Sequence, residues 1–370
     1  MLALRAPCNF SQQRRVTPSR VAIVCQAKKS NGPKVAIVGI TGAVGQEFLT
    51  VLKERDFPYS EIKMLASARS AGKKQAFDGV EYTVEELTDK SFDGIDIALF
   101  SAGGSISKKF GPLAAKSGCI VVDNSSAFRM TEGVPLVIPE VNPQAMSHIK
   151  VGKGKGAIIA NPNCSTIIAL MAVTPLHRIA KVNRMVVSTY QAASGAGAAA
   201  MEELRQQTRD ILDGKPAVPQ IFPHQYAFNL FSHNSPMLED IGYNEEEMKL
   251  VKETAKIWST KDVRITATCI RVPVMRAHAE SINLEFENEI TEDQALKALK
   301  SFPGVSIIND RKKNRFPTPL DATTKDDVFV GRVRRDISRS DRRGLDLFVC
   351  GDQIKKGAAL NAVQIAELLL

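Results

Sequence analysis

The sequence predicts an α/β protein: a Rossmann-type doubly wound parallel sheet followed by a second, α+β domain. Short β-branched runs that are typical of buried strands alternate with helical segments over the first 160 residues. This pattern indicates a parallel sheet with helices packed against it. Beyond residue 180 the strand-like runs alternate apolar and polar residues, as half-buried strands do.

The first predicted strand covers residues 34–39 and leads directly into a glycine-rich turn. Gly39, Gly42 and Gly45 have the spacing GxxGxxG, and a helical segment with Phe48 and Leu49 on its apolar side follows. Glycine permits a tight strand-to-helix turn, and the helix N-terminus then faces a pyrophosphate. The turn is therefore a variant of the dinucleotide-binding fingerprint.

The second predicted strand, 62–66, ends in a stretch with basic residues and no carboxylate. An NAD enzyme is expected to place a ribose-binding carboxylate near this point. Arg69 and Ser70 stand there instead, and both suit a 2′-phosphate, so the sequence favours NADP over NAD. Lys73 and Lys74 are more typical of a solvated basic loop.

Two further strands, 95–100 and 119–123, complete the nucleotide-binding pattern. The first ends in small residues, 101–105, which let a ligand approach the backbone at the carboxyl edge of a parallel sheet. The second leads into a loop that contains Arg129, whose guanidinium can bind a phosphate or a carboxylate.

Cys164 ends the tetrad Asn-Pro-Asn-Cys at 161–164 and begins an apolar helical run. A thiol at this position faces free backbone N–H groups and the positive end of the helix dipole. Both favour the thiolate, so Cys164 is a candidate nucleophile at neutral pH. The alternative is a buried structural cysteine, as most free cysteines are.

The second half supplies candidate partners for this thiol. Gln191 ends the strand 185–191, before a small-residue stretch at 192–200 that suits a close backbone approach or a mobile segment rather than a core. Arg271 and His278 lie on either side of a break between two strands, where side chains are often turned into sites.

Two helices are predicted in this half. Most charges of the helix 244–258 should lie on a solvated face. The helix 357–369 has apolar residues at helical spacing and should pack on the first domain's sheet.

The distribution of charge argues against a nucleic-acid partner. Six of the nine net positive charges fall within the first 33 residues, which contain no acidic residue. An arginine-bearing, acid-free leader indicates an organellar transit peptide over residues 1–32, with processing near 24–27. The alternative is a disordered N-terminal tail that carries no targeting signal. We expect a plastid (chloroplast stroma), with the mitochondrion as the second choice.

The six cysteines include no CxxC pair, so neither a metal site nor a disulfide framework is expected. No apolar stretch approaches the length of a membrane span. These features leave a protein that works on small molecules, without a nucleic-acid or membrane partner.

The combination of motifs resembles the aspartate-β-semialdehyde dehydrogenase family from about residue 33 to the C-terminus. The resemblance lies in residues 39–45, 67–72, 124–129, 161–166, 191–195, 246–249, 271–278 and 351–367. It implies reduction of L-aspartyl-4-phosphate by NADPH to L-aspartate-4-semialdehyde and phosphate, as a step towards lysine, threonine and methionine. It also implies a homodimer, with domains over 33–162 (joined by 351–370) and 163–350.

The resemblance assigns a role to each matched position. Cys164 would be the acylated nucleophile and His278 the general acid/base. The residues implied for substrate and phosphate are Arg129, Asn163, Gln191, Glu246, Lys249 and Arg271. Those implied for NADP are Gly39, Thr41, Gly42, Ala43, Val44, Arg69, Ser70, Ser194, Gly195 and Gln353. Gln353 stands where the family usually has asparagine.

Three other functions remain open on the sequence. N-acetyl-glutamyl-phosphate reductase uses the same chemistry, but its cysteine motif is flanked by glycine, unlike Asn163-Cys164-Ser165 here. A cofactor-free cysteine hydrolase would leave the glycine-rich turn unexplained. A non-catalytic nucleotide-binding relative would leave the nucleophile, the base and the cations without a role.

Overall fold

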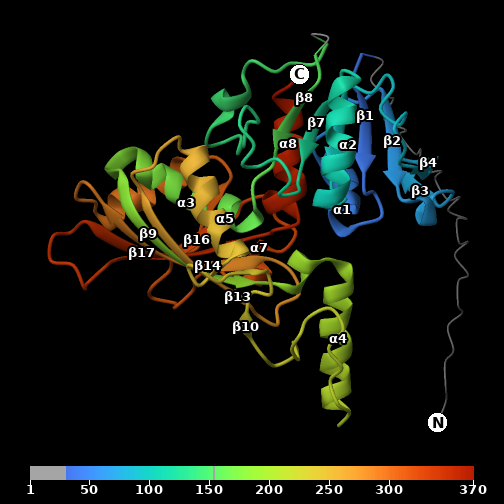
Figure 1. Ribbon diagram of the computed structural model, residues 1–370. Helices are drawn as coiled ribbons and strands as arrows, with labels where there is room; N and C mark the ends of the chain where they lie inside the picture. The colour runs from blue at the N-terminus through green and yellow to red at the C-terminus, as the bar shows by residue number, and fades with distance from the viewer. Residues whose placement is uncertain (1–30, 153–154) are drawn as a thin grey trace, which may run out of the picture.

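The computed structural model describes residues 31–152 and 155–370, which form two sheets side by side (Figure 1). The transit peptide and its processing site, predicted within 1–32, lie almost wholly outside the described residues. Within the described part, no helix combines the length and the apolar character that crossing a membrane requires.

The first sheet is fully parallel, with strand order β5-β2-β1-β6-β7-β8. This confirms the predicted doubly wound sheet. The strands are β1 (Lys34–Val38), β2 (Glu61–Ala66), β5 (Glu85–Glu86), β6 (Ile97–Phe100), β7 (Ile120–Asp123) and β8 (Ala157–Ala160).

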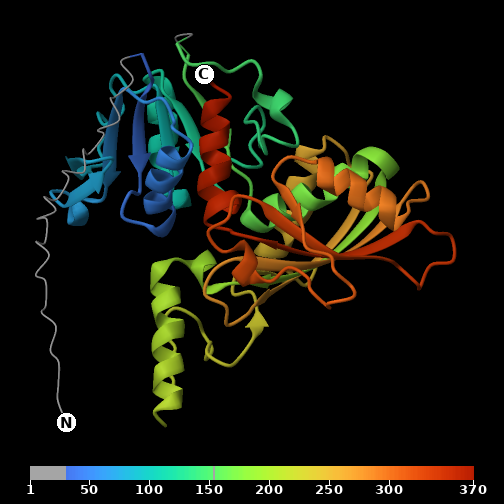
Figure 2. The ribbon, with the colours of Figure 1, turned by 180° about the vertical axis from the view of Figure 1, so that it is seen from behind.

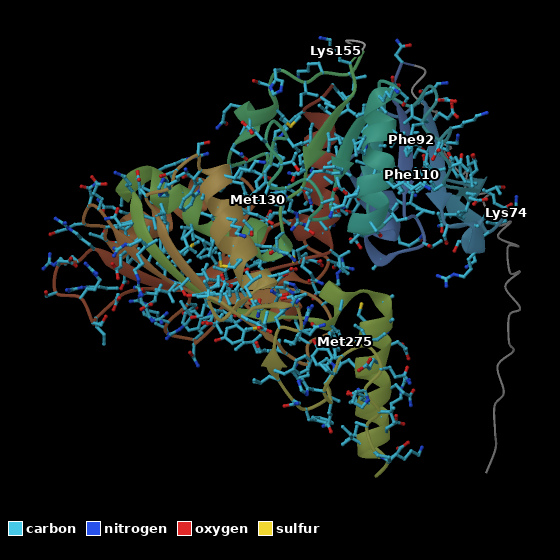
Figure 3. The ribbon with its side chains drawn as sticks, in the orientation of Figure 1. Lys74, Phe92, Phe110, Met130, Lys155 and Met275 are labelled. Carbon is cyan, nitrogen blue, oxygen red and sulfur yellow. The ribbon has the colours of Figure 1, made fainter. Side chains whose placement is uncertain are left out.

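Helices cover both faces of this sheet. α1 (Ala43–Glu54) and the C-terminal α8 (Leu360–Glu367) share one apolar cluster with it, and α2 (Gly104–Lys116) shares another on the opposite face. Figure 3 shows Phe110 on α2 with Phe92 near it, whereas Lys74 points outward from the edge of the domain.

The expected alternation of strands and helices is wrong at two crossovers. Within the described residues, the segments after β2 and β7 contain no α-helix. Between β2 and β5 lie a 3₁₀ turn (Ala68–Ser70) and the hairpin of β3 (Lys74–Phe77) and β4 (Val80–Thr83). After β7 only a 3₁₀ turn (Pro143–Met146) precedes β8. The face left uncovered is occupied by α8, which arrives from the end of the chain.

The predicted return of the C-terminal helix to the first sheet is confirmed. A π-helical segment (Lys355–Ala359) leads into α8. The fully buried Lys356 bonds Glu140 at 2.6 Å. Arg55, which directly follows α1, bonds Glu367 at 2.6 and 2.7 Å. These ion pairs join segments that are more than 200 residues apart in the sequence.

The second sheet is mixed, with strand order β10-β13-β9-β14-β17-β16-β15. Helices α3 (Cys164–Ala180), α5 (Glu245–Ile257) and α6 (Glu292–Ser301) pack on one face and form the largest apolar cluster with it. The strands are β9 (Val182–Gln191), β10 (Phe231–Ser232), β13 (Arg264–Arg271), β14 (His278–Phe286), β15 (Val305–Ile307), β16 (Val328–Arg335) and β17 (Gly344–Gly351). The remaining elements are β11 (Met237–Leu238), β12 (Tyr243–Asn244) and α7 (Pro319–Ala322).

Helix α4 (Ala198–Leu212) extends away from both sheets, as the two opposite views show (Figures 1 and 2). The small-residue stretch at 192–200 was expected to be unsuited to a core, and this is correct for residues 195–199, which are exposed or half-buried, but wrong for its ends. Ala193 and Ala200 are fully buried against Tyr226. Small side chains allow α4 and the chain before it to pack closely on that ring.

Candidate active site

The register of the second sheet aligns three candidate residues at one end of neighbouring strands. Arg271, at the end of β13, is paired with Gln191 at the end of β9. The pairing of Ala279 with Tyr190 places His278, the first residue of β14, next to Gln191. All three polar side chains are buried. Residues far apart in the sequence thus form one row across the sheet.

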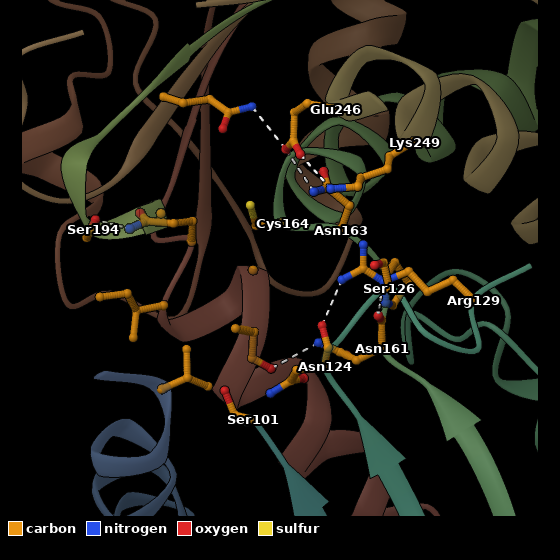
Figure 4. Close-up of a pocket in the computed structure, with 18 of the residues that line it drawn as sticks. Ser101, Asn124, Ser126, Arg129, Asn161, Asn163, Cys164, Ser194, Glu246 and Lys249 are labelled. Carbon is orange, nitrogen blue, oxygen red and sulfur yellow. Dashed lines mark hydrogen bonds and ion pairs between the residues drawn. The ribbon is translucent and has the colours of Figure 1, made fainter. Parts of the chain in front are cut away.

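Cys164 begins helix α3 and faces this row from above the sheet. Asn163 is the N-cap, and its side-chain oxygen accepts the N–H groups of Ser165 and Thr166. Figure 4 shows the Cys164 thiol between Ser194 on one side and Asn163 with Glu246 on the other. The cleft around it is lined by these other predicted residues: Val44, Arg129, Gln191, Gly195, Lys249, Arg271 and Gln353.

The predicted thiolate at Cys164 is wrong for this structure. Burial, and after it the Glu246 carboxylate, raises the pKa of the Cys164 thiol to about 12. Arg129, Lys249 and Arg271 act in the opposite direction without offsetting burial. Desolvation of a charged sulfur in an enclosed cleft therefore outweighs the helix dipole, and the thiol is neutral at pH 7.

His278 lies directly behind the cleft wall. A Cβ on Gly195 would stand 3.1 Å from Cε1 and 3.3 Å from Nε2 of this imidazole, so glycine is needed for the close approach. Burial and the Arg271 charge lower the pKa of His278 to about 3, so the ring is neutral at pH 7.

The tautomer of His278 follows from its hydrogen bonds. Nδ1 accepts the backbone N–H of Ala192 at 3.0 Å, which requires a lone pair on Nδ1. A neutral imidazole then carries its proton on Nε2. This atom is buried and has no partner among the described residues. His278 therefore presents an N–H donor toward the site.

Helix α5 contributes a buried acidic side chain to the cleft. Glu246 accepts hydrogen bonds from Asn163 (2.9 Å), Gln191 (3.3 Å) and Lys249 (2.8 Å). Although burial opposes ionisation, the charge of Lys249 and the hydrogen bonds from Lys249 and Asn163 lower the pKa of Glu246, which is therefore a carboxylate.

Arg129 reaches the cleft from the loop after β7 and is held by a second acidic residue of α5. It bonds Glu253 at 3.0 Å and the backbone oxygens of Asn161 and Asn124 at 2.9 and 2.8 Å. The other Glu253 oxygen accepts the backbone N–H of Asn163 at 2.7 Å.

The prediction of a solvated charged face on α5 is therefore wrong for three of its four acidic residues; the fourth, Glu245, is exposed. Glu246, Glu247 and Glu253 are all buried. The helix pattern in the sequence did not show this, because their partners come from elements up to 124 residues away.

A groove for a nucleotide lies along the carboxyl edge of the first sheet. It is lined by Gly39, Thr41 and Gly42, by the end of β2, and by Ser101 after β6. Gly39 has a φ of +88°, and a Cβ there would stand 2.3 Å from the Ser101 carbonyl oxygen. Ser101 also lines the cleft of Cys164, so the groove and the cleft are adjacent. Ala43 lies between these two sets of residues and lines neither.

The residues predicted to select NADP are placed beside the groove rather than in its lining. Arg69 is exposed and Ser70 is buried in the 3₁₀ turn after β2. Contrary to expectation, a carboxylate does line the groove: Glu86 of β5, whose strand pairs with Leu65 and Ala66. A strand later in the chain supplies it, which is why the sequence around residue 70 did not show it.

Two cofactor candidates from different parts of the chain contact each other. The Gln353 amide donates to the Ser194 hydroxyl, and its oxygen accepts the backbone N–H of Ala277 at 2.9 Å. Gln353, which lines the cleft, thus links the segment before α4 to the segment before α8.

Several cleft residues were not among the predicted site residues, and two of them, Asn124 and His233, carry polar groups of interest. Asn124 directly follows β7, and both polar atoms of its amide are buried without a partner among the described residues. His233 lies between β10 and β11 and also lines the cleft. The position of Asn124 at a strand end was a usable signal, whereas nothing in the local sequence marked His233. In the described ranges, no group of three or more His, Cys, Asp or Glu could hold a metal ion.

Comparison with known proteins agrees with this geometry. Residues 34–149 match the family model described as semialdehyde dehydrogenase, NAD binding domain, and residues 173–356 match semialdehyde dehydrogenase, dimerisation domain. A curated aspartate-semialdehyde dehydrogenase of Synechocystis sp. is 54% identical over 91% of this chain and 97% of its own length. That of Aquifex aeolicus is 52% identical over 92% and 98%.

A solved structure shows the same fold at high similarity. The structure of aspartate semialdehyde dehydrogenase II from Vibrio cholerae, complexed with ASA, has a TM-score of 0.87 and 44% identity. The match covers 92% of this chain and 98% of that one.

Proposed function

The chain belongs to the aspartate-semialdehyde dehydrogenase family, whose members are oxidoreductases of amino-acid biosynthesis, and we propose its specific reaction on that premise. The reaction is NADPH-dependent reductive dephosphorylation of L-aspartyl-4-phosphate to L-aspartate-4-semialdehyde through a thioester on Cys164. The product would serve lysine, threonine and methionine synthesis.

One observation carries this proposal: the only described cysteine with exposure to the cleft lies where a nucleotide groove meets a cluster of cations. Cys119, Cys269 and Cys350 are buried, whereas Cys164 is partly exposed. Ser101 joins its cleft to the groove. A thiol, a nucleotide site and cations for anionic substrate ends are the parts that reduction of an acyl phosphate needs.

The residues support the first half of the reaction as follows. The Cys164 sulfur attacks the acyl carbon, and the acyl–oxygen bond breaks. Because the thiol is protonated at pH 7, its proton leaves with the phosphate as hydrogen phosphate, so charge and atoms balance. Arg129 and Lys249 would hold the phosphate, with Asn163 beside them.

The other substrate groups find complementary partners. The Glu246 carboxylate would accept hydrogen bonds from the substrate ammonium, Arg271 would bind the α-carboxylate, and Gln191 would orient the acyl group. A nicotinamide bound near Val44 and Ser194 would supply the hydride that reduces the thioester. The Nε2–H of His278 would donate a hydrogen bond to the oxygen on which negative charge develops.

The test is phosphate-dependent NADPH formation from aspartate semialdehyde, measured for the wild type and for Cys164→Ser. We expect Cys164→Ser to lose at least about 10³-fold in kcat while its melting temperature still rises with NADP. The control substrate is N-acetyl-glutamate semialdehyde. Preference of the wild type for this longer aldehyde would refute the substrate assignment, and full activity of Cys164→Ser would refute the covalent route.

We propose NADP as the cofactor because Arg69 is the first cation after the end of β2 and directly follows the groove residue Ala68. Arg69→Ala should lower kcat/KM for NADP by about tenfold and leave NAD unchanged. Glu86→Gln, which removes the groove carboxylate, is the matched variant and should not weaken NADP. An enzyme that prefers NAD, and loses that preference in Glu86→Gln, would reverse this assignment.

We also propose a homodimer, formed through the sheet face that is opposite α3 and α5. The family model of residues 173–356 is described as a dimerisation domain. On that face the side chains of Tyr190 and Phe348 form an aromatic contact and are only half-buried. Sedimentation of the wild type and of Phe348→Glu tests this: the substitution should shift the dimer to a monomer.

The plastid destination remains a proposal that rests on the composition of residues 1–32. A fluorescent protein fused behind this segment should enter plastids. The same fusion with Arg14 and Arg15 replaced by Glu should stay outside them. Import into mitochondria instead would overturn the proposal.

A further inference from the structure

The segment 233–235 lies beside the active-site cleft, which His233 lines, and the reaction described above does not use it. It follows β10, whose residue Phe231 pairs with Arg271 at the end of β13. The pairing continues beyond the strand, because the backbone N–H of His233 donates to the carbonyl oxygen of Cys269 at 2.8 Å. His233 therefore lies at a fixed position beside the end of β13.

Each residue of this segment contacts the substrate side of the cleft. Asn234 accepts the Nε–H of Arg271 at 3.3 Å, and the Ser235 hydroxyl accepts the backbone N–H of Glu246 at 3.1 Å. The imidazole of His233 itself lines the cleft together with Arg271 and Glu246. The segment thus bridges the two groups proposed to bind the amino-acid end of the substrate.

The hydrogen bonds of His233 define which ring atom is a donor. Nδ1 accepts the backbone N–H of Ser235 at 3.1 Å, so this nitrogen holds a lone pair. Burial and the Arg271 charge lower the pKa of His233 to about 4, so the ring is neutral at pH 7. The single ring proton is therefore on Nε2, for which no protein partner exists among the described residues.

The hydrogen-bonding capacity of Arg271 leaves room for this donor. Its Nε–H is used by Asn234, and Nη1 lies 3.4 Å from the carbonyl oxygen of Ala192. A carboxylate has about four lone-pair sites, more than the remaining N–H groups of one fixed guanidinium fill. Glu246, by contrast, already accepts from Asn163, Gln191 and Lys249.

We propose that His233 is a specificity-determining residue that donates its Nε2–H to the substrate α-carboxylate beside Arg271. This inference rests on the proposed function, which supplies an amino-acid substrate. A histidine with a purely structural role in its loop would also accept the Ser235 N–H on Nδ1. The two roles differ in one respect: only a substrate contact makes the loss of kcat/KM in a His233 variant depend on the substrate carboxylate.

The experiment combines one variant with substrates that lack one group each. Wild type and His233→Ala are assayed with aspartate semialdehyde, with 4-oxobutanoate (no ammonium) and with 3-aminopropanal (no carboxylate). We expect His233→Ala to lower kcat/KM about tenfold or more for the first two aldehydes and less than about twofold for 3-aminopropanal. The KM for phosphate should stay the same.

His233→Gln and His224→Ala serve as companion variants. Glutamine keeps an N–H donor and should recover most of the loss, and it secures the test if His233→Ala fails to fold. His224 is exposed and does not line the cleft, so its variant should match the wild type.

An equal loss with 3-aminopropanal overturns the inference, and so does a loss that vanishes with 4-oxobutanoate, which would assign His233 to the ammonium. Absence of wild-type turnover with aspartate semialdehyde would refute the proposed function itself. Wild-type turnover with no change in His233→Ala would refute only the role of His233.

Discussion

Gly357 lies against Cys164: a Cβ at residue 357 would stand 2.9 Å from the Cβ of Cys164 and 3.3 Å from its Cα. The segment that leads the chain back to the first sheet therefore also forms part of the wall behind the nucleophile. Only glycine suits position 357, because any side chain there would have to displace the start of α3.

This contact predicts that Gly357→Ala impairs catalysis more than folding. The methyl group would move the sulfur by a few tenths of an ångström or more relative to the bound acyl group. A misplacement near 1 Å can cost about 100-fold, so we expect kcat/KM to fall about 10- to 100-fold. The melting temperature and its rise with NADP separate a displaced thiol from an unfolded chain. Wild-type activity would show that Cys164 tolerates the shift.

The raised pKa of Cys164 predicts a steep pH dependence of its reactivity. Only the thiolate is alkylated, and with a pKa of about 12 its fraction should rise nearly tenfold for each pH unit between 7 and 10. The measurement is the rate of iodoacetamide labelling of Cys164, followed by peptide mass spectrometry. A labelling rate that already reaches a plateau near pH 7 would contradict the raised pKa and show that Cys164 is a thiolate at that pH.

The donor tautomer of His278 predicts which substitution preserves activity. Glutamine can replace an N–H donor but cannot act as a proton-transfer group. His278→Gln should stay within about tenfold of the wild-type kcat, whereas His278→Ala should lose about 10²- to 10³-fold, as for loss of an oxyanion donor. Steady-state kinetics of the two variants decides this. Equal losses in both would mean that the imidazole transfers the proton.

The buried Glu280, which does not line the cleft, should make the stability of the protein depend on pH. This carboxyl group is fully buried on β14, and neither oxygen has a partner among the described residues. Burial raises its pKa well above the ordinary value. The folded protein therefore keeps the proton that the unfolded chain releases above a pH of about 4.3, so stability declines as the pH rises towards the folded-state pKa.

Glu280→Gln removes this dependence. The unfolding free energy of the variant, relative to the wild type, should increase by about 1–3 kcal/mol between pH 4.5 and pH 8. Urea unfolding at several pH values measures it. The exposed Glu289→Gln is the control and should show no such slope. A flat difference for Glu280→Gln would place an ionised carboxylate in this position.

The family resemblance assigned most of the candidate site residues, whereas the sequence by itself determined the class of the fold and marked the glycine-rich turn and Cys164 as candidates. Both followed from short-range physics: β-branched runs define the buried strands, the glycines at 39, 42 and 45 define the turn, and Asn163 caps the helix that Cys164 begins. The motif around each residue was sufficient, because strand formation, tight turns and helix capping depend on neighbours in the chain.

Only the tertiary structure decided the protonation states of the buried groups and which distant parts of the chain supply residues to the site. Glu253 is buried because Arg129, 124 residues away, neutralises it, and Glu86 reaches the groove because β5 pairs with β2. His233 enters the cleft through the pairing of β10 with β13. Desolvation, which depends on every atom packed around a group, reversed the protonation expected for Cys164. A local sequence pattern contains no information about the atoms that will be packed around a side chain in the folded protein.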